Sequence, residues 1–204
     1  MSLNVNAGNG GGKDFAPVSE GVHVARCYQI IDLGHQTVEW QGTVKVLPKV
    51  RITWEICDEQ MSDGRPFSIS KEYTASIGIK ATLRKDLEAW RARKFTDAEL
   101  ANFSLENVLK APCQLQIGHT VKGDKTYASV NSIMALPKGM QCAELVNPAV
   151  KFDIQNFDHD IFNSLTSYVQ KKIMMSKELE ENGIPEAREE VEQEPVIESD
   201  EVPF

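Results

Sequence analysis

Three basic side chains recur at odd positions between Val44 and Ile56, and this spacing suits contact with a polyanion. They are Lys45, Lys49 and Arg51, whereas the even positions of the same segment are mainly apolar. Because successive side chains of a β-strand point to opposite faces, the pattern predicts a strand whose apolar face meets a core. Its other face would then present a row of positive charge to a bound anion.

Charge is divided unequally along the chain. From Glu178 to the last residue there are eleven acids and one base, a net charge of −10. Because the whole chain carries −8, the residues before Glu178 carry +2, with 21 bases and 19 acids. This asymmetry predicts a basic surface for a polyanion and an acidic tail that imitates one and competes with it at low salt. The Glu- and Pro-rich composition predicts that this tail, 178–204, is disordered.

Hydrophobic periodicity predicts a mainly β domain at 16–147, preceded by a glycine-rich, flexible N-terminus at 1–15. Apolar residues at helical spacing from Leu83 to Trp90 predict a helix between the third and fourth strands, and a capping-box pattern at Thr96 opens a second one. The predicted strands lie at 22–33, 44–56, 67–77, 113–117 and 126–136. Five antiparallel strands with a helix in that place are the pattern of a closed OB-fold barrel.

The pattern changes after Pro148. Apolar residues at helical spacing from Ile161 to Ile173 predict an amphipathic helix within the segment 148–177. The sequence leaves open whether this helix packs on its own domain or on another subunit. A homo-oligomer is therefore one of the arrangements that the sequence allows.

The cysteines and histidines do not predict a metal site. Cys27, Cys57, Cys113 and Cys142 are widely separated, without a Cys-x-x-Cys pair, and no histidine stands at a zinc-like spacing from them. We therefore expect reduced cysteines that act as small, buried apolar residues, with no metal and no other cofactor. No apolar stretch reaches the length of a signal peptide or a membrane span, so we expect a cytoplasmic protein without membrane contact.

The acidic end of the sequence resembles the C-terminal tip of bacterial and phage single-stranded DNA-binding proteins. In the bacterial proteins, a run of aspartates precedes a final Ile-Pro-Phe. The corresponding residues here are Asp200, Glu201, Val202, Pro203 and Phe204. The resemblance implies that they bind replication, recombination or repair proteins, with the Phe ring in an apolar pocket and the carboxylates at basic side chains around it.

The body of the sequence, over residues 20–140, also resembles a group of phage and prophage single-stranded DNA-binding proteins. The helical insertion at 80–110 departs from the bacterial family, so the bacterial tetramer is not carried over. The matching stretches are 31–34, 50–56, 70–74, 83–91, 95–100 and 113–119. This resemblance implies an OB-fold protein that coats single-stranded DNA in phage replication, recombination or repair, in the cytoplasm of the bacterial host.

A protein that binds single strands without sequence preference needs a basic groove for the phosphates and exposed aromatic rings on which bases stack. Trp40 lies near the turn before the basic strand and is the best candidate for stacking, while Tyr127 lies beside a basic hairpin turn. The residues that we expect to contact single-stranded DNA are Trp40, Lys45, Lys49, Arg51, Lys71, Tyr73, Arg84, Arg91, Lys122, Lys125 and Tyr127.

Some of these residues have an equally direct structural interpretation. Tyr73 shares a strand face with Ile69 and Ile77, which favours a place in the core. Basic residues on a helix are commonly no more than a solvated face. The density of bases around Arg84 and Arg91 nevertheless favours a role in binding DNA.

Two other functions stay open. The sequence contains no P-loop, nucleophile elbow or close Cys/His pairing that would indicate an enzyme. A magnesium-dependent nuclease would need carboxylates such as Asp32, Glu55 and Glu72, which stand on predicted strands. The second alternative is an adaptor without affinity for DNA, in which the tail does all the binding. The basic face of the strand at 44–56 argues against it.

Overall fold

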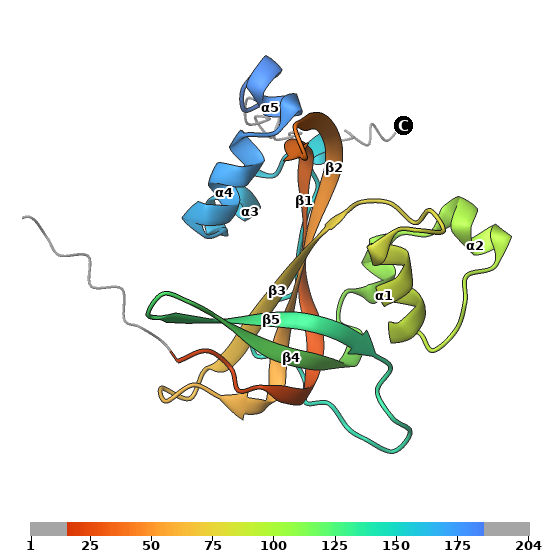
Figure 1. Ribbon diagram of the computed structural model, residues 1–204, viewed down its shortest axis with the longest axis vertical. Coiled ribbons are helices and arrows are strands. Elements are labelled where there is room, and N and C mark those ends of the chain that lie inside the picture. The colour runs from red at the N-terminus through yellow and green to blue at the C-terminus, as the bar shows by residue number, and fades with distance from the viewer. Residues whose placement is uncertain (1–15, 186–204) are drawn as a thin grey trace, which may run out of the picture.

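The computed structural model describes residues 16–185, which form a mainly β fold with several short helices (Figure 1). Five strands pair in the antiparallel order β3-β2-β1-β4-β5, and a short sixth strand pairs in parallel with β1. The strands are β1 (Gly21–Trp40), β2 (Thr43–Gln60), β3 (Pro66–Thr74), β4 (Pro112–Lys122), β5 (Lys125–Met134) and β6 (Val150–Phe152). The prediction of a mainly β domain is confirmed.

The sheet is open in its hydrogen bonding. Its two ends, β3 and β5, approach each other but form no ladder. The space between them is lined by side chains, among them Phe67 and Tyr127. A closed five-stranded barrel therefore goes beyond what the backbone pairing supports.

β1 and β2 form one long hairpin, which in Figure 1 runs the height of the molecule. The turn at Gln41 and Gly42 has φ values of 48° and 74°, as a two-residue type I′ turn requires. The pairing slips between Asp32 and His35, so that Leu33 and Gly34 of β1 lie opposite the single residue Lys49 of β2. Gly34, with a φ of 66°, makes this bulge.

The first core lies on one face of this sheet. The even residues of β2 from Val50 to Ile56 are buried, as predicted. Val44 and Val46, which the same alternation assigns to the core, are instead 62% and 48% exposed. They lie near the tip of the β1–β2 hairpin, which extends beyond the residues that could cover them.

The insertion between β3 and β4 closes one end of the first core. It contains α1 (Thr82–Trp90), α2 (Asp97–Asn102) and the 3-10 helix η1 (Leu105–Val108). The Trp90 ring lies 5.8 Å from the Trp54 ring of β2. The capping box at Thr96 is confirmed, since its side chain accepts from the Glu99 amide while the Glu99 carboxylate accepts from the Thr96 amide.

A second core lies on the opposite face of β1. Ile31 and Leu33, which are fully buried there, pack against the segment after residue 149. The elements of this C-terminal layer are β6, the 3-10 helix η2 (Ile154–Asn156), α3 (His159–Ser164), α4 (Ser167–Met174) and α5 (Lys177–Asn182). The layer packs on the sheet of its own chain, beside the upper part of β1 in Figure 1.

The C-terminal layer differs from the prediction in two ways. The single predicted helix is split, because Leu165 is extended and buried between α3 and α4. The ordered chain also continues past residue 178, where the tail was predicted to begin. Glu178 accepts from the His35 ring at 2.6 Å and Leu179 is buried, so α5 belongs to the fold. Among the helices that the structure describes, none has the length and apolar character needed to cross a bilayer.

Glu88 of α1 makes the stability of the helical insertion depend on pH. Its carboxylate is 8% exposed and accepts from Lys94 at 2.8 Å and from Arg84 at 3.0 Å. These two bonds hold the pKa of Glu88 at about 2, below its ordinary value of 4.5. Since the folded pKa is the lower one, Glu88 stabilises the fold above pH 4.5, and this contribution is lost as the pH falls toward 2.

We therefore expect Glu88→Gln to lower the urea midpoint of unfolding at pH 7. The difference in midpoint between this variant and the wild type should become smaller as the pH falls from 5 to 3. Asp124→Asn, at an exposed hairpin turn, is the control and should follow the wild type throughout. A gap that stays constant between pH 7 and pH 3 would show that Glu88 does not act through its charge.

Candidate nucleic-acid interface

A groove of about 590 Å³ lies where β3 and β5 fail to pair. Its walls come from 66–70 at the start of β3, from 126–128 in β5 and from 16–18 before β1. Arg51 of β2 and Arg65 of the β2–β3 turn also line it. A cleft between two strand edges, lined by cations and aromatic rings, has the character that a single-stranded nucleic acid requires.

The groove contains two aromatic residues, Tyr127 and Phe67. Tyr127 is 51% exposed, and the sequence predicted it as a stacking residue. Phe67 is half-buried and was not predicted, because it shares the apolar alternation of Ile69. It lies at the start of β3, an edge strand of the sheet, where it packs against the first core and also lines the groove. Its place on an edge strand leaves Phe67 partly exposed, and the apolar alternation does not show which strand forms the edge.

Lys122 and Lys125 stand at the tip of the β4–β5 hairpin. They are paired opposite each other and both are exposed, and no acid of the described residues forms a salt bridge with either. Two like charges held opposite each other repel, and a bound anion would relieve that repulsion. Asp124 in the same turn offsets part of their charge.

The C-terminal layer reaches one residue of the basic face predicted for β2, Arg51. Arg51 is half-buried, its guanidinium lies 5.5 Å from the ring of Tyr168 in α4, and its Nη1 lies 3.1 Å from a Glu72 oxygen. Lys172 of α4 also donates to Glu72. Burial disfavours the charged form of Lys172, but its hydrogen bonds to Glu72 and Tyr168 outweigh this and raise its pKa. Arg51 therefore reaches the groove while already paired, and a phosphate would compete with Glu72 for it.

Lys71 and Tyr73 of β3 are held inside the fold. Both side chains donate to the same Asp86 oxygen of α1, Lys71 at 2.8 Å and Tyr73 at 2.9 Å. Tyr73 is only 4% exposed, and burial, together with Asp86, raises its pKa. Its ring offers no face to a base, so its inclusion among the DNA-binding residues is corrected in favour of the core. Lys49 is half-buried and donates to Thr74 at 3.0 Å.

The basic residues of the helical insertion are also engaged within the fold. Arg84 donates to Glu88, and the Arg91 guanidinium packs 4.3 Å from the centre of the Phe95 ring while bonding to Glu99. Arg93 and then Arg91, with the Thr96 amide, hold the pKa of Glu99 at about 2. The density of bases that favoured DNA binding thus has a structural cause, and neither Arg84 nor Arg91 lines the groove.

Lys45 and Trp40 lie away from the groove. Both belong to the tip of the β1–β2 hairpin, which Figure 1 shows far from the β4–β5 hairpin. Lys45 is exposed, and the backbone of Trp40 pairs with Thr43 at the turn. The structure therefore does not bring these two residues together with Tyr127.

The three carboxylates considered for a nuclease serve separate structural contacts. Glu55 is 2% exposed and accepts from the amides of Val146 and Asn147, both at 2.9 Å. Glu72 bonds to Arg51, and Asp32, whose pKa is raised by burial, accepts from the Gly34 amide. Across residues 16–185, no three or more His, Cys, Asp or Glu side chains are grouped so as to hold a metal ion.

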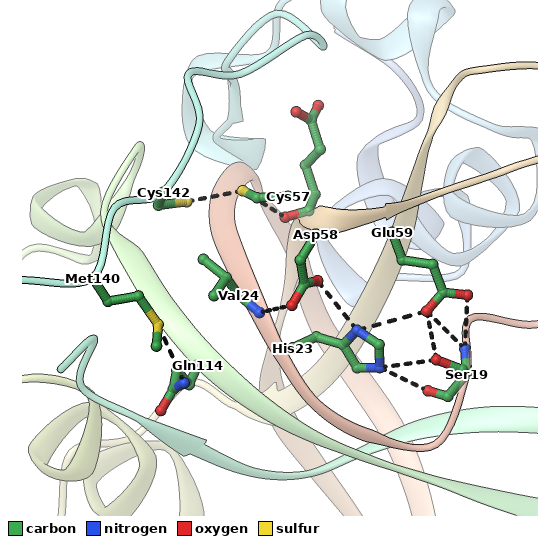
Figure 2. Close-up of polar contacts among 10 residues, drawn as sticks. Ser19, His23, Val24, Cys57, Asp58, Glu59, Gln114, Met140 and Cys142 are labelled. Carbon is green, nitrogen blue, oxygen red and sulfur yellow. Dashed lines mark hydrogen bonds and ion pairs between the residues drawn. The ribbon is translucent and has the colours of Figure 1, made fainter.

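Ser19, His23 and Asp58 have the residue types of a hydrolytic triad, but not its geometry (Figure 2). The Ser19 hydroxyl donates to Glu59 at 2.5 Å, and the His23 Nε2 lies closer to the Ser19 carbonyl, at 2.9 Å, than to the hydroxyl, at 3.4 Å. The other ring nitrogen of His23 faces Asp58 at 3.2 Å. The short hydrogen bond of the Ser19 hydroxyl thus goes to Glu59 and not to the ring, so Ser19 is not arranged as a nucleophile beside a base. The cluster instead fastens the segment before β1 to the end of β2.

The acidic tip, Asp200 to Phe204, lies outside the described residues, and the partner-binding role given to it stays a prediction. A scan against models of known protein families gives no match, and a search of curated proteins gives no significant match. The functional argument therefore depends on the residues and geometry of the groove.

The different surroundings of Arg91 and Lys122 can be tested by their effects on stability. Arg91→Ala removes packing on Phe95 and the pair with Glu99, so we expect the free energy of unfolding to fall by about 1–3 kcal/mol. Lys122→Ala should change it by less than about 0.5 kcal/mol, because this side chain is exposed at a hairpin tip. Urea denaturation measures both. Equal effects of the two substitutions would contradict the structural role of Arg91.

Proposed function

We propose that this protein binds single-stranded DNA without sequence preference, and that the strand occupies the groove between β3 and the β4–β5 hairpin. The observation that carries the proposal is the groove itself, in which exposed Tyr127 and half-buried Phe67 meet Arg51 and Arg65. A cavity of about 660 Å³ in the helical insertion also has aromatic rings and arginines, but its Arg91 and Arg93 both pair with Glu99.

The strand arrangement supports an OB-fold as the scaffold. The order β3-β2-β1-β4-β5, with β3 approaching β5 and a helical insertion between β3 and β4, follows the chain path of that barrel. In an OB-fold, single strands commonly lie across the second and third strands, flanked by loops. The groove here shares β3 and the β4–β5 hairpin with that place, while the β1–β2 turn does not line it.

Each part of the groove has a task in this proposal. The ring of Tyr127 stacks on a base, and Phe67 provides an apolar surface beside it. Lys122 and Lys125 do not line the groove but stand at the hairpin tip next to Tyr127. There they attract the phosphates that follow, and counterion release makes this part of the affinity depend on salt. Ser68, an exposed short polar side chain in the groove, can hydrogen-bond to sugar or phosphate without selecting a base.

Titration of labelled oligo-dT, followed by fluorescence anisotropy, tests the proposal directly. We expect the wild type to bind at modest ionic strength and to leave the oligonucleotide intact, with or without magnesium. Tyr127→Ala should weaken binding roughly 5- to 150-fold, as the loss of one stacked base predicts. Tyr127→Phe keeps the ring and should bind as the wild type does.

Three results would contradict the proposal. The wild type could fail to bind oligo-dT, which would favour an adaptor. It could shorten the oligonucleotide in magnesium, which would favour a nuclease. Finally, equal affinities of Tyr127→Ala and wild type would place the strand elsewhere on the protein.

The hairpin lysines predict a change in salt dependence. The double variant Lys122→Ala, Lys125→Ala should bind oligo-dT more weakly at low salt, and the slope of log K against log salt should fall by about 1.4 for two lost phosphate contacts. Lys138→Ala removes an exposed lysine that lies after β5, outside the β4–β5 hairpin, and is the matched control. An unchanged slope in the double variant would show that these lysines do not contact phosphate.

A further inference from the structure

Two cysteine thiols meet on the face of the sheet opposite the first core. The Sγ atoms of Cys57, in β2, and Cys142 are 2.8 Å apart, although the residues are 85 positions apart in sequence (Figure 2). Non-bonded heavy atoms prefer separations of about 3.5–4.0 Å, and a disulfide bond needs about 2.05 Å. The two sulfurs are therefore already closer than ordinary contact, and a small movement would allow a bond.

Cys142 belongs to the connection between β5 and β6, residues 135–149, which we call the strap. The strap crosses three neighbouring strands and is fastened to each. Gln114 of β4 donates to Met140, Arg26 of β1 donates to the Cys142 carbonyl at 2.9 Å, and Glu55 of β2 accepts from the strap amides. These contacts hold Cys142 beside Cys57, so the approach of the two thiols is a product of the fold.

The other two cysteines have different surroundings. Cys27 and Cys113 have no exposed surface and belong to the first core. Cys57 and Cys142 are half-buried, so a small oxidant can reach them. The sequence, in which all four cysteines stand far apart, did not distinguish this pair from the core cysteines.

We propose that Cys57 and Cys142 form a redox site, in which a peroxide oxidises the two thiols to a disulfide that ties the strap to β2. This inference does not depend on DNA binding. The strap leads directly into the C-terminal layer, so the bond would also fix the start of that layer on the sheet.

The chemistry needs one equivalent of peroxide. One thiol sulfur attacks the O–O bond and becomes a sulfenic acid, while the second oxygen leaves with the thiol proton as water. The other sulfur then attacks the sulfenic sulfur, the S–S bond forms, and the S–O bond breaks to release a second water. The two sulfurs lose two electrons and the peroxide gains them. Burial, and then Cys142, raises the pKa of Cys57 to about 12, so little thiolate is present near neutral pH and the reaction is slow.

The test uses the full chain, reduced and then freed of reductant. It is treated with hydrogen peroxide, blocked with N-ethylmaleimide and digested without reduction. We expect a peptide that links Cys57 to Cys142 in a monomer whose mass has lost two hydrogen atoms, with Cys27 and Cys113 recovered as thiols after unfolding. Because the bond closes a long loop, the thermal midpoint should rise by about 5–15 °C, and reductant should reverse the rise.

Matched variants separate the disulfide from other oxidation. Cys142→Ser and Cys57→Ser should each show neither the link nor the rise in midpoint. Met175→Leu removes an exposed thioether that has no contact with the strap and keeps both thiols, and it should behave as the wild type does. Recovery of Cys57 and Cys142 as separate thiols or sulfinic acids would overturn the proposal, as would a disulfide between two copies. Formation of the Cys57–Cys142 disulfide without a rise in the thermal midpoint would show that the bond does not stabilise the strap on β2.

Discussion

Burial of β1 on both faces is the constraint on which the rest of this fold depends. Ile30 and Ile31 are neighbours in sequence, yet one packs into the first core and the other into the second. A strand can serve two cores only if layers cover both of its sides. The sheet, with its helical insertion, supplies one layer, and the segment after residue 149 supplies the other. The contact of Arg51 in β2 with Tyr168 follows from this arrangement, since α4 packs beside β1.

The availability of positive charge follows from the same packing. Where elements meet, acids and bases pair, as Arg51 does with Glu72 and Arg91 with Glu99. At Lys122 the hairpin extends past the neighbouring strands, and the base forms no salt bridge with a described residue. Its charge is therefore accessible to another molecule. Position relative to the packed layers, and not the number of bases, decides which cations a ligand can use.

The sequence was informative where an interaction is local and less so where it is not. Alternation located β2, and the four-residue capping box at Thr96 was readable because both partners lie within one turn. The pairing of Arg51 with Glu72 depends on strand register, which alternation does not specify. Helical spacing likewise runs unbroken through Leu165, so the break there could not be seen. Of the candidate site, Tyr127 was found, whereas Phe67 has the pattern of a core residue.

Gly34 links the two layers at a single point. A Cβ atom on this residue would lie 2.7 Å from the Cβ of Ser176 and 2.8 Å from the side chain of Ile154, and its φ of 66° also disfavours a larger residue. Any side chain here would clash with the C-terminal layer and push it away from the sheet. Variation at position 34 is therefore restricted by a neighbour more than a hundred residues away, and that restriction would disappear in a relative that lacks the layer.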